Sequence, residues 1–187
     1  MAPQTSTRMT YEDYLELPDD GKRYEVIEGE LVVNASPIPR HQQIALRIGS
    51  RVDFYFEQHG GGRVFVAPLD VVLDDDVVLQ PDVMIICEGR MHVVGPTHIH
   101  GAPDLIVEVL SDRTRKRDEN VKRKLYERHG VNEYWVVDPV AEIVSIYRRN
   151  GDSFTRVAEI SVQTGGALTS PLLPGFSLDV SDVFPRT

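Results

Sequence analysis

The chain has 187 residues, of which 41% are hydrophobic and 26% charged, and its 29 acidic and 20 basic side chains give a net charge of -9. This composition predicts a soluble globular protein and excludes disordered, collagen-like and coiled-coil classes. We expect a single domain over residues 1–187, with residues 1–9 as a flexible tail. No stretch is apolar enough for a membrane span, which needs roughly 20 such residues.

The number of cysteines and the distribution of charged residues narrow the class of protein further. One cysteine, Cys87, excludes an internal disulfide and fits a reducing cytoplasm, and the first ten residues lack the apolar block of a secretory signal. The overall acidity argues against broad non-specific binding of nucleic acid. Residues 113–128 are the exception, since they carry +5 while the rest carries -14. A phosphate-bearing partner would meet this segment first.

The first third of the chain predicts a helix, a hairpin and a second helix. Residues 9–18 form an amphipathic helical turn, and residues 23–35 alternate around Gly29 as a β-hairpin does. Residues 41–58 predict a long helix. Its apolar positions recur near helical spacing: Ile44, Leu46, Ile48, Val52, Phe54 and Phe56.

The middle of the chain predicts strands. After the glycines at 60–62, residues 63–79 are rich in β-formers and contain a turn at 74–76, which predicts a hairpin. The runs VMIIC (83–87) and LIVEVL (105–110) are almost entirely apolar, as in strands buried on both faces. We expect these two strands at the centre of a sheet.

The last third predicts one helix, then strands. Residues 115–129 form a helix ended by Gly130, and strands follow at 133–138, 143–149 and 154–160, before an apolar closing segment at 172–184. The order strand, helix, strand between 105 and 137 predicts a crossover joining parallel neighbours. The fold class is therefore α/β with a mixed sheet.

Two carboxylates interrupt the apolar strands. Glu108 lies inside LIVEVL, and Asp82 begins VMIIC directly after a proline. A carboxylate inside a sheet is costly unless it is paired or bound to metal. Asp82 could instead cap the entry of its strand, and Glu108 could form a buried ion pair with a lysine or arginine.

A lysine of the helix completes a possible site. At ~100° per residue, Lys122 falls between Leu125 and Tyr126 on the apolar face, whereas Lys124 points away. Lys122 could extend its stem along the core edge, or it could bring its ammonium to the two carboxylates. Two acids can hold a hard divalent cation such as Mg²⁺, and a lysine can orient or deprotonate a water while it balances phosphate charge. This set is typical of metal-assisted phosphodiester hydrolysis.

Several segments, in order along nearly the whole chain, resemble the Uma-type restriction endonucleases of the PD-(D/E)XK nuclease superfamily. The resemblance implies a restriction-endonuclease-like core with an N-terminal β-hairpin and flanking helices, and a Mg²⁺- or Mn²⁺-dependent site that cleaves DNA. The matching segments are RYEVIEGELV, SPIPRHQQIALRI, QPDVMI, PDLIVEVLS, KRKLYERHGVNEYWVVDP and LLPGFSLDVSDVF.

Carried over by position, the resemblance makes Asp82 the acid of the PD pair and Glu108 the acid of the (D/E)XK element. The usual lysine position holds Leu110, and Lys122 matches the lysine that this family is thought to have moved to the following helix. Glu25 matches a further acidic position that holds metal or is structural. His41 matches a motif position, although it could simply cap its helix.

The implied partner is DNA. Its contacts are expected from the basic segment, and a homodimer is expected by analogy with nucleases that cut two strands. The alternative, which the acidity outside the basic segment favours, is a catalytically silent interaction module on a nuclease-like fold. The expected DNA-binding residues are Arg115, Lys116, Arg117 and Lys124.

Overall fold

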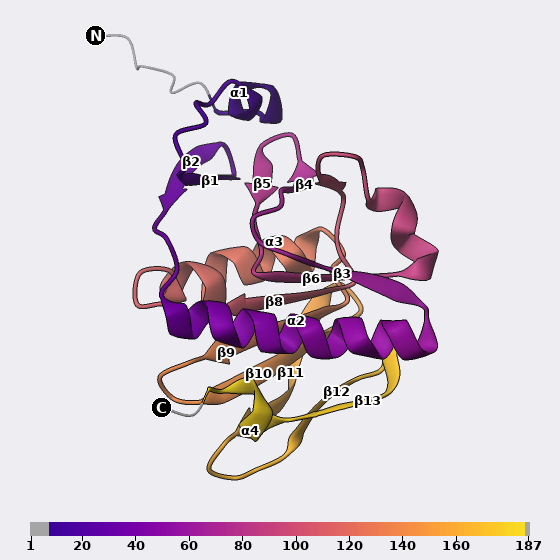
Figure 1. Ribbon diagram of the computed structural model, residues 1–187. Coiled ribbons are helices and arrows are strands. Elements are labelled where there is room, and N and C mark those ends of the chain that lie inside the picture. The colour runs from indigo at the N-terminus through magenta and orange to yellow at the C-terminus, as the bar shows by residue number, and fades with distance from the viewer. Residues whose placement is uncertain (1–7, 186–187) are drawn as a thin grey trace, which may run out of the picture.

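The structure, a computed structural model, describes residues 8–185 and builds them into three β-sheets and their covering helices (Figure 1). The N-terminal part begins with α1 (Tyr11–Leu15), which Thr10 and Asp13 start with a capping box. Of the expected tail, residues 1–7 lie outside the described residues. Arg8 and Met9 are hydrogen-bonded to the turn of the following hairpin, at Glu28 and Gly29.

The smaller main sheet has five strands in the order β2-β1-β5-β4-β7. Strands β1 and β2 form the predicted N-terminal hairpin, which turns at Gly29 with a positive φ of 82°. The strands are β1 (Arg23–Ile27), β2 (Glu30–Asn34), β4 (Val71–Asp74), β5 (Val77–Leu79) and β7 (Ile99–His100).

The larger sheet has six strands in the order β11-β10-β9-β8-β6-β3. Strands β6 and β8 are neighbouring inner strands of this sheet, as predicted from their apolar runs, although β6 lies next to the edge strand β3. Strand β8 also pairs with β9 in parallel, so the predicted crossover is confirmed. The strands are β3 (Gly62–Val66), β6 (Val83–Cys87), β8 (Leu105–Val109), β9 (Glu133–Asp138), β10 (Ile143–Asn150) and β11 (Ser153–Ser161).

The hairpin expected over residues 63–79 is only partly correct. Strands β4 and β5 form a hairpin, but β3 belongs to the other main sheet. The chain leaves the larger sheet near Pro68, because a proline has no N–H to donate to a sheet ladder. One apolar run therefore supplies strands to two different sheets.

Helix α2 (Pro39–His59) lies along one face of the larger sheet (Figure 1). Ile44, Ile48, Val52 and Phe56 form its buried stripe and pack against β6 and β8. Leu46 and Phe54, which we expected among the apolar positions, are 66% and 59% exposed. Each lies two residues from a buried position, which turns it by ~200° and places it on the opposite side of the helix.

The opposite face of the larger sheet is covered by the crossover. Its first part, η2 (Arg117–Lys122), is a π-helix, and it continues as α3 (Arg123–Arg128). Leu125 and Tyr126 pack in the core between the two main sheets, whereas Val121, the reference for the predicted apolar face, is 39% exposed. The uniform 100° spacing fails here because a π-helix winds more slowly than an α-helix.

The remaining elements close the molecule. A two-stranded sheet and α4 pack against α2 within the same core. None of the helices in the described range combines the length and apolar character that a membrane span needs. These elements are η1 (Glu88–Val93), β12 (Ala167–Ser170), β13 (Leu173–Asp179) and α4 (Val180–Val183).

Candidate active site

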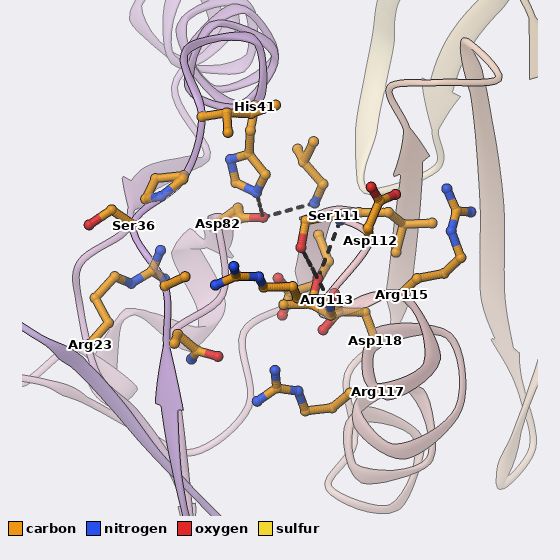
Figure 2. Close-up of a pocket in the computed structure, with 18 of the residues that line it drawn as sticks. Arg23, Ser36, His41, Asp82, Ser111, Asp112, Arg113, Arg115, Arg117 and Asp118 are labelled. Carbon is orange, nitrogen blue, oxygen red and sulfur yellow. Dashed lines mark hydrogen bonds and ion pairs between the residues drawn. The ribbon is translucent and has the colours of Figure 1, made fainter.

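A cavity of about 700 Å³ opens where the hairpin β1–β2, the N-terminal end of α2, the ends of β6 and β8 and the start of η2 meet (Figure 2). Glu25, Asp82, Glu108 and Lys122 all line it. Four predicted site residues, separated by up to 97 positions in the sequence, are therefore brought to one cavity.

Strand register places Asp82 and Glu108 opposite each other. Val83 of β6 pairs with Val107 of β8 in an antiparallel ladder, so the next position along pairs Asp82 with Glu108. Opposed residues of antiparallel strands project to the same face. Asp82 Oδ2 also accepts a hydrogen bond of 2.8 Å from the backbone N–H of Val109. The contact reaches the neighbouring strand, which is not what a cap of its own strand would do.

Glu108 is held in a buried position by two donors. Its Oε1 accepts hydrogen bonds from the Tyr126 hydroxyl at 2.7 Å and from Lys122 Nζ at 3.0 Å. Burial, followed by the negative charges of Asp82, Asp118 and Glu25, raises the pKa of Glu108 to about 8, although Lys122 opposes this shift. The buried ion pair expected as an alternative for Glu108 is present, and it lies inside the candidate site.

Lys122 joins two strands and its own helix. Its Nζ lies 2.8 Å from Glu25 Oε1, 3.0 Å from Glu108 Oε1 and 3.7 Å from Asp118 Oδ1. Burial alone would lower the pKa of Lys122, but the charges of these carboxylates outweigh it and raise the pKa above its ordinary value. The surrounding carboxylates therefore favour the ammonium form of Lys122.

Glu25 anchors the other side of the lysine. Its carboxylate is fully buried and also accepts hydrogen bonds from the Gln80 backbone N–H at 2.9 Å and from Asn34 Nδ2 at 2.7 Å. Burial opposes ionisation, yet Lys122 and these two donors lower the pKa of Glu25 overall. Glu25 is accordingly an ionised group held by Lys122, Gln80 and Asn34, which suits a positioning role.

His41 contacts the site and does not cap its helix. The N-cap of α2 is Ile38, while His41 Nε2 lies 3.1 Å from Asp82 Oδ2. The cap expected as an alternative is therefore wrong. The other ring nitrogen, Nδ1, is buried without a hydrogen-bond partner among the described residues.

The four residues expected to bind DNA divide into two groups. Arg115 and Arg117 line the cavity, whereas Lys116 and Lys124 are exposed and lie outside its lining. Arg115 is paired with Asp138 at 2.6 Å.

Two groups of the site were not foreseen in the sequence. Asp118 is buried against Lys122 four residues later, and its Oδ1 has no hydrogen-bond partner among the described residues. Tyr126 was placed on the apolar face, and its hydroxyl in fact binds Glu108. The spacing of Asp118 and Lys122 was the available signal, since residues four apart share a helix face.

The donor set fits a magnesium-like ion. Within residues 8–185, no group of three or more His, Cys, Asp or Glu side chains is arranged to hold a metal. Mg²⁺ does not need one, because it keeps several waters and binds through one or two carboxylates. Asp82 and Glu108 supply two, and a cation would balance the negative charges of Asp82, Asp118 and Glu25, which add to burial in raising the pKa of Glu108. The Oδ1 atom of Asp118 is also buried without a hydrogen-bond partner among the described residues.

The fold is similar to that of a solved crystal structure. A crystal structure of a protein from Anabaena variabilis ATCC 29413, described as a "putative nuclease belonging to DUF820", matches with a TM-score of 0.78. The match has 21% sequence identity and covers 94% of this chain and 97% of that one. At this identity the likeness establishes the shared nuclease-like fold.

The sequence itself identifies the family. The Uma2 family, described as "Putative restriction endonuclease", matches residues 11–181. The chain therefore belongs to the Uma2 family, as the resemblance in its motifs predicted. A comparison with curated proteins finds no match.

Proposed function

We propose that the protein is a metal-dependent endonuclease that hydrolyses phosphodiester bonds of DNA. The observation that carries the proposal is the pairing of Asp82 and Glu108 across neighbouring central strands, at the wall of an open cavity and beside a buried ammonium. Family membership supports the same reaction class.

Asp82 and Glu108 are the proposed ligands of Mg²⁺, or of Mn²⁺ in its place. When bound, the ion lowers the pKa of a water and stabilises charge on the phosphate. Asp82 is oriented for this task by the Val109 N–H and by His41, and Glu108 by Tyr126 and Lys122. Such partners fix the direction of a ligating oxygen.

Lys122 is proposed to orient Glu108 and to balance charge during cleavage. Its raised pKa argues against a role as proton acceptor, because an ammonium between two carboxylates keeps its proton. Glu25 holds Lys122 in place from β1. We assign DNA contacts to Arg115 and Arg117 inside the cavity and to Lys116 and Lys124 outside it.

We further propose a homodimer in the cytoplasm. One cavity of this kind can cut one strand, so cleavage of a duplex at both strands calls for a second copy. A single, half-buried cysteine is compatible with a reducing compartment.

Cleavage of supercoiled plasmid in Mg²⁺ or Mn²⁺ tests the proposal. We expect nicked and linear products with the wild type and their loss in Asp82→Asn. The matched control is Asp74→Asn, an exposed acid at the end of β4, which should cleave like the wild type. If the wild type cleaves no DNA with either metal, the protein is instead an interaction module on a nuclease-like fold.

A further inference from the structure

Two arginines of the cavity lack an acidic partner and a third has only a distant one, whereas most arginines of the described residues have a carboxylate oxygen within 4.0 Å. Arg40, Arg90, Arg115, Arg128, Arg148 and Arg156 each have a carboxylate oxygen within 4.0 Å, and the shortest of these contacts is 2.6 Å. Within residues 8–185, Arg23 and Arg113 have no such contact, and the contact of Arg117 with Glu25 is long, at 3.9 Å. All three line the cavity.

Arg23 is oriented by a neutral group. Its Nε donates to Gln80 Oε1 at 3.1 Å and its Nη2 to the Gln80 carbonyl at 2.9 Å. The Gln80 side chain is fixed in turn, because its amide donates to Asp70 at 2.7 Å and Tyr14 also donates to Asp70, at 2.8 Å. An amide holds the guanidinium in position and leaves its charge uncompensated.

Arg117 has a buried N–H group with no hydrogen-bond acceptor among the described residues. Its side chain is 21% exposed, and its Nη1 is a buried atom without a hydrogen-bond partner among the described residues. The nearest carboxylate, Glu25, already accepts from Lys122, Gln80 and Asn34. A buried, unmatched donor is costly, so a ligand that accepts from it gains affinity.

Arg113 completes the group from the loop before η2. It is exposed and makes no side-chain hydrogen bond within the described residues. Figure 2 shows Arg113 and Arg23 extending toward each other from opposite sides of the cavity, with Arg117 below them. Three guanidinium groups from three separate positions in the sequence thus face one part of the cavity.

The lining of this cavity is less acidic than the chain as a whole. Five acidic and five basic side chains line it, so the lining is neutral in a chain whose net charge is -9. Of the five acids, Glu25, Glu108 and Asp118 surround Lys122, Asp82 lies directly before β6, and Asp112 precedes Arg113 in the loop before η2. Since Arg115 is paired with Asp138, the other three arginines are the cations of the lining that no close carboxylate balances. Guanidinium groups match the oxygen geometry of phosphate through paired N–H donors.

We propose that Arg23, Arg113 and Arg117 form a binding subsite for a phosphate of the DNA strand next to the phosphate that is cleaved. This inference rests on the proposed function. The scissile phosphate lies at Asp82 and Glu108, and its neighbour in the same strand is held by the three guanidinium groups. The subsite fixes the register of the strand over the carboxylates and reads no base sequence.

DNA binding without cleavage tests the subsite. The affinity of a fluorescent DNA duplex is measured by anisotropy in EDTA between 50 and 200 mM NaCl for wild type, Arg23→Gln, Arg117→Gln and Arg113→Gln. Each variant should bind roughly tenfold more weakly and lower the salt slope by about one. The matched control is Arg63→Gln, an exposed arginine of β3 outside the cavity that also lacks a carboxylate within 4.0 Å in the described range; it should match the wild type.

The outcomes separate the subsite from the proposed function. Arg113 makes no side-chain bonds that folding could lose, so its variant stays informative if Arg23→Gln or Arg117→Gln unfolds by circular dichroism. Cavity variants that bind DNA like Arg63→Gln overturn the subsite even if the wild type cleaves plasmid. A wild type that does not bind the duplex also overturns it. Weaker binding in the cavity variants, with no cleavage by any protein, supports the phosphate-binding role of the three arginines and rejects the nuclease.

A parallel titration with inorganic phosphate shows whether the arginines bind phosphate alone. If the wild type binds free phosphate but the variants bind DNA as tightly as the wild type, the assignment of the subsite to a phosphate of the DNA strand is overturned.

Discussion

At the scale of single residues, the site is a set of buried charges that do not balance. Glu25, Glu108 and Asp118 surround a single lysine, and Asp82 lies opposite Glu108. Removing one member of such a cluster leaves its partners without compensation while their side chains are almost fully buried. Substitutions here therefore report both on chemistry and on folding.

Lys122→Ala should keep metal binding and lose cleavage. The ligating carboxylates remain, but Glu108 loses one of its two orienting donors, and we expect plasmid cleavage to fall by roughly 10²- to 10⁴-fold. The variant should also lose about 3–5 kcal/mol in its free energy of unfolding, because the ionised Glu25 loses its buried cation and Glu108 loses a hydrogen-bond donor. Calorimetric titration with Mn²⁺ and urea unfolding measure these effects.

The control for this substitution is Lys124→Ala, on the same helix but exposed. It should cleave normally and at most weaken DNA binding with a smaller salt slope. Lys122→Gln retains a hydrogen-bond donor and serves if the alanine variant does not fold. Cleavage by folded Lys122→Ala or Lys122→Gln at the wild-type rate would reject the role given to the lysine.

Glu108 should make the metal-free protein less stable as the pH rises from 5 to 8. Its pKa is about 8 in the folded protein against an ordinary 4.5, so in this window the folded state holds a proton that the unfolded chain has lost. The folded state then binds more protons, and the free energy of unfolding falls with pH, by about 1.4 kcal/mol per unit at most. Glu108→Gln lacks this titration.

Urea unfolding in EDTA at pH 5, 6.5 and 8 measures the effect. The glutamine variant should gain stability relative to wild type across this range, whereas Glu159→Gln, which changes an exposed acid paired with Arg156, should show a constant difference. A constant difference for Glu108→Gln as well would contradict the raised pKa.

At the scale of elements, the sequence predicted best where one periodicity governs a segment. Strands β6 and β8 were placed at the sheet centre because their residues are apolar without alternation, and the length of α2 followed from its four-residue spacing. The prediction failed where backbone geometry changes within a segment. The π-helix η2 altered the helical phase, and Pro68 divided one β-rich run between two sheets.

Ile48 and Leu46, two aliphatic residues of α2, test which face of this helix is buried. Ile48 is fully buried against the larger sheet, whereas Leu46, which was counted among the same apolar positions, is 66% exposed. Ile48→Ala should lower the free energy of unfolding by about 2–5 kcal/mol, and Leu46→Ala by less than about 0.5 kcal/mol. Equal losses in urea unfolding would place Leu46 in a contact, for instance with a second copy of the chain.

At the scale of the whole molecule, the site is assembled from parts that the sequence keeps far apart. Asp82, Glu108 and Lys122 could be selected in advance because each puts charge on an otherwise apolar face. Asp118 and Arg23 could not, since an acid in a charged helix and an arginine at a strand end are ordinary surface residues until the sheets meet. Pairing across sheets is a tertiary property that local patterns do not encode.

The central claim is that Asp82 and Glu108 together hold one divalent cation. Crystals soaked in Mn²⁺ test it directly through anomalous scattering. We predict a single strong peak per chain in the cavity, with oxygens of both carboxylates at roughly 2.0–2.6 Å, and no peak there in Asp82→Asn. An empty cavity at millimolar Mn²⁺, or a peak that contacts neither carboxylate, would contradict the account.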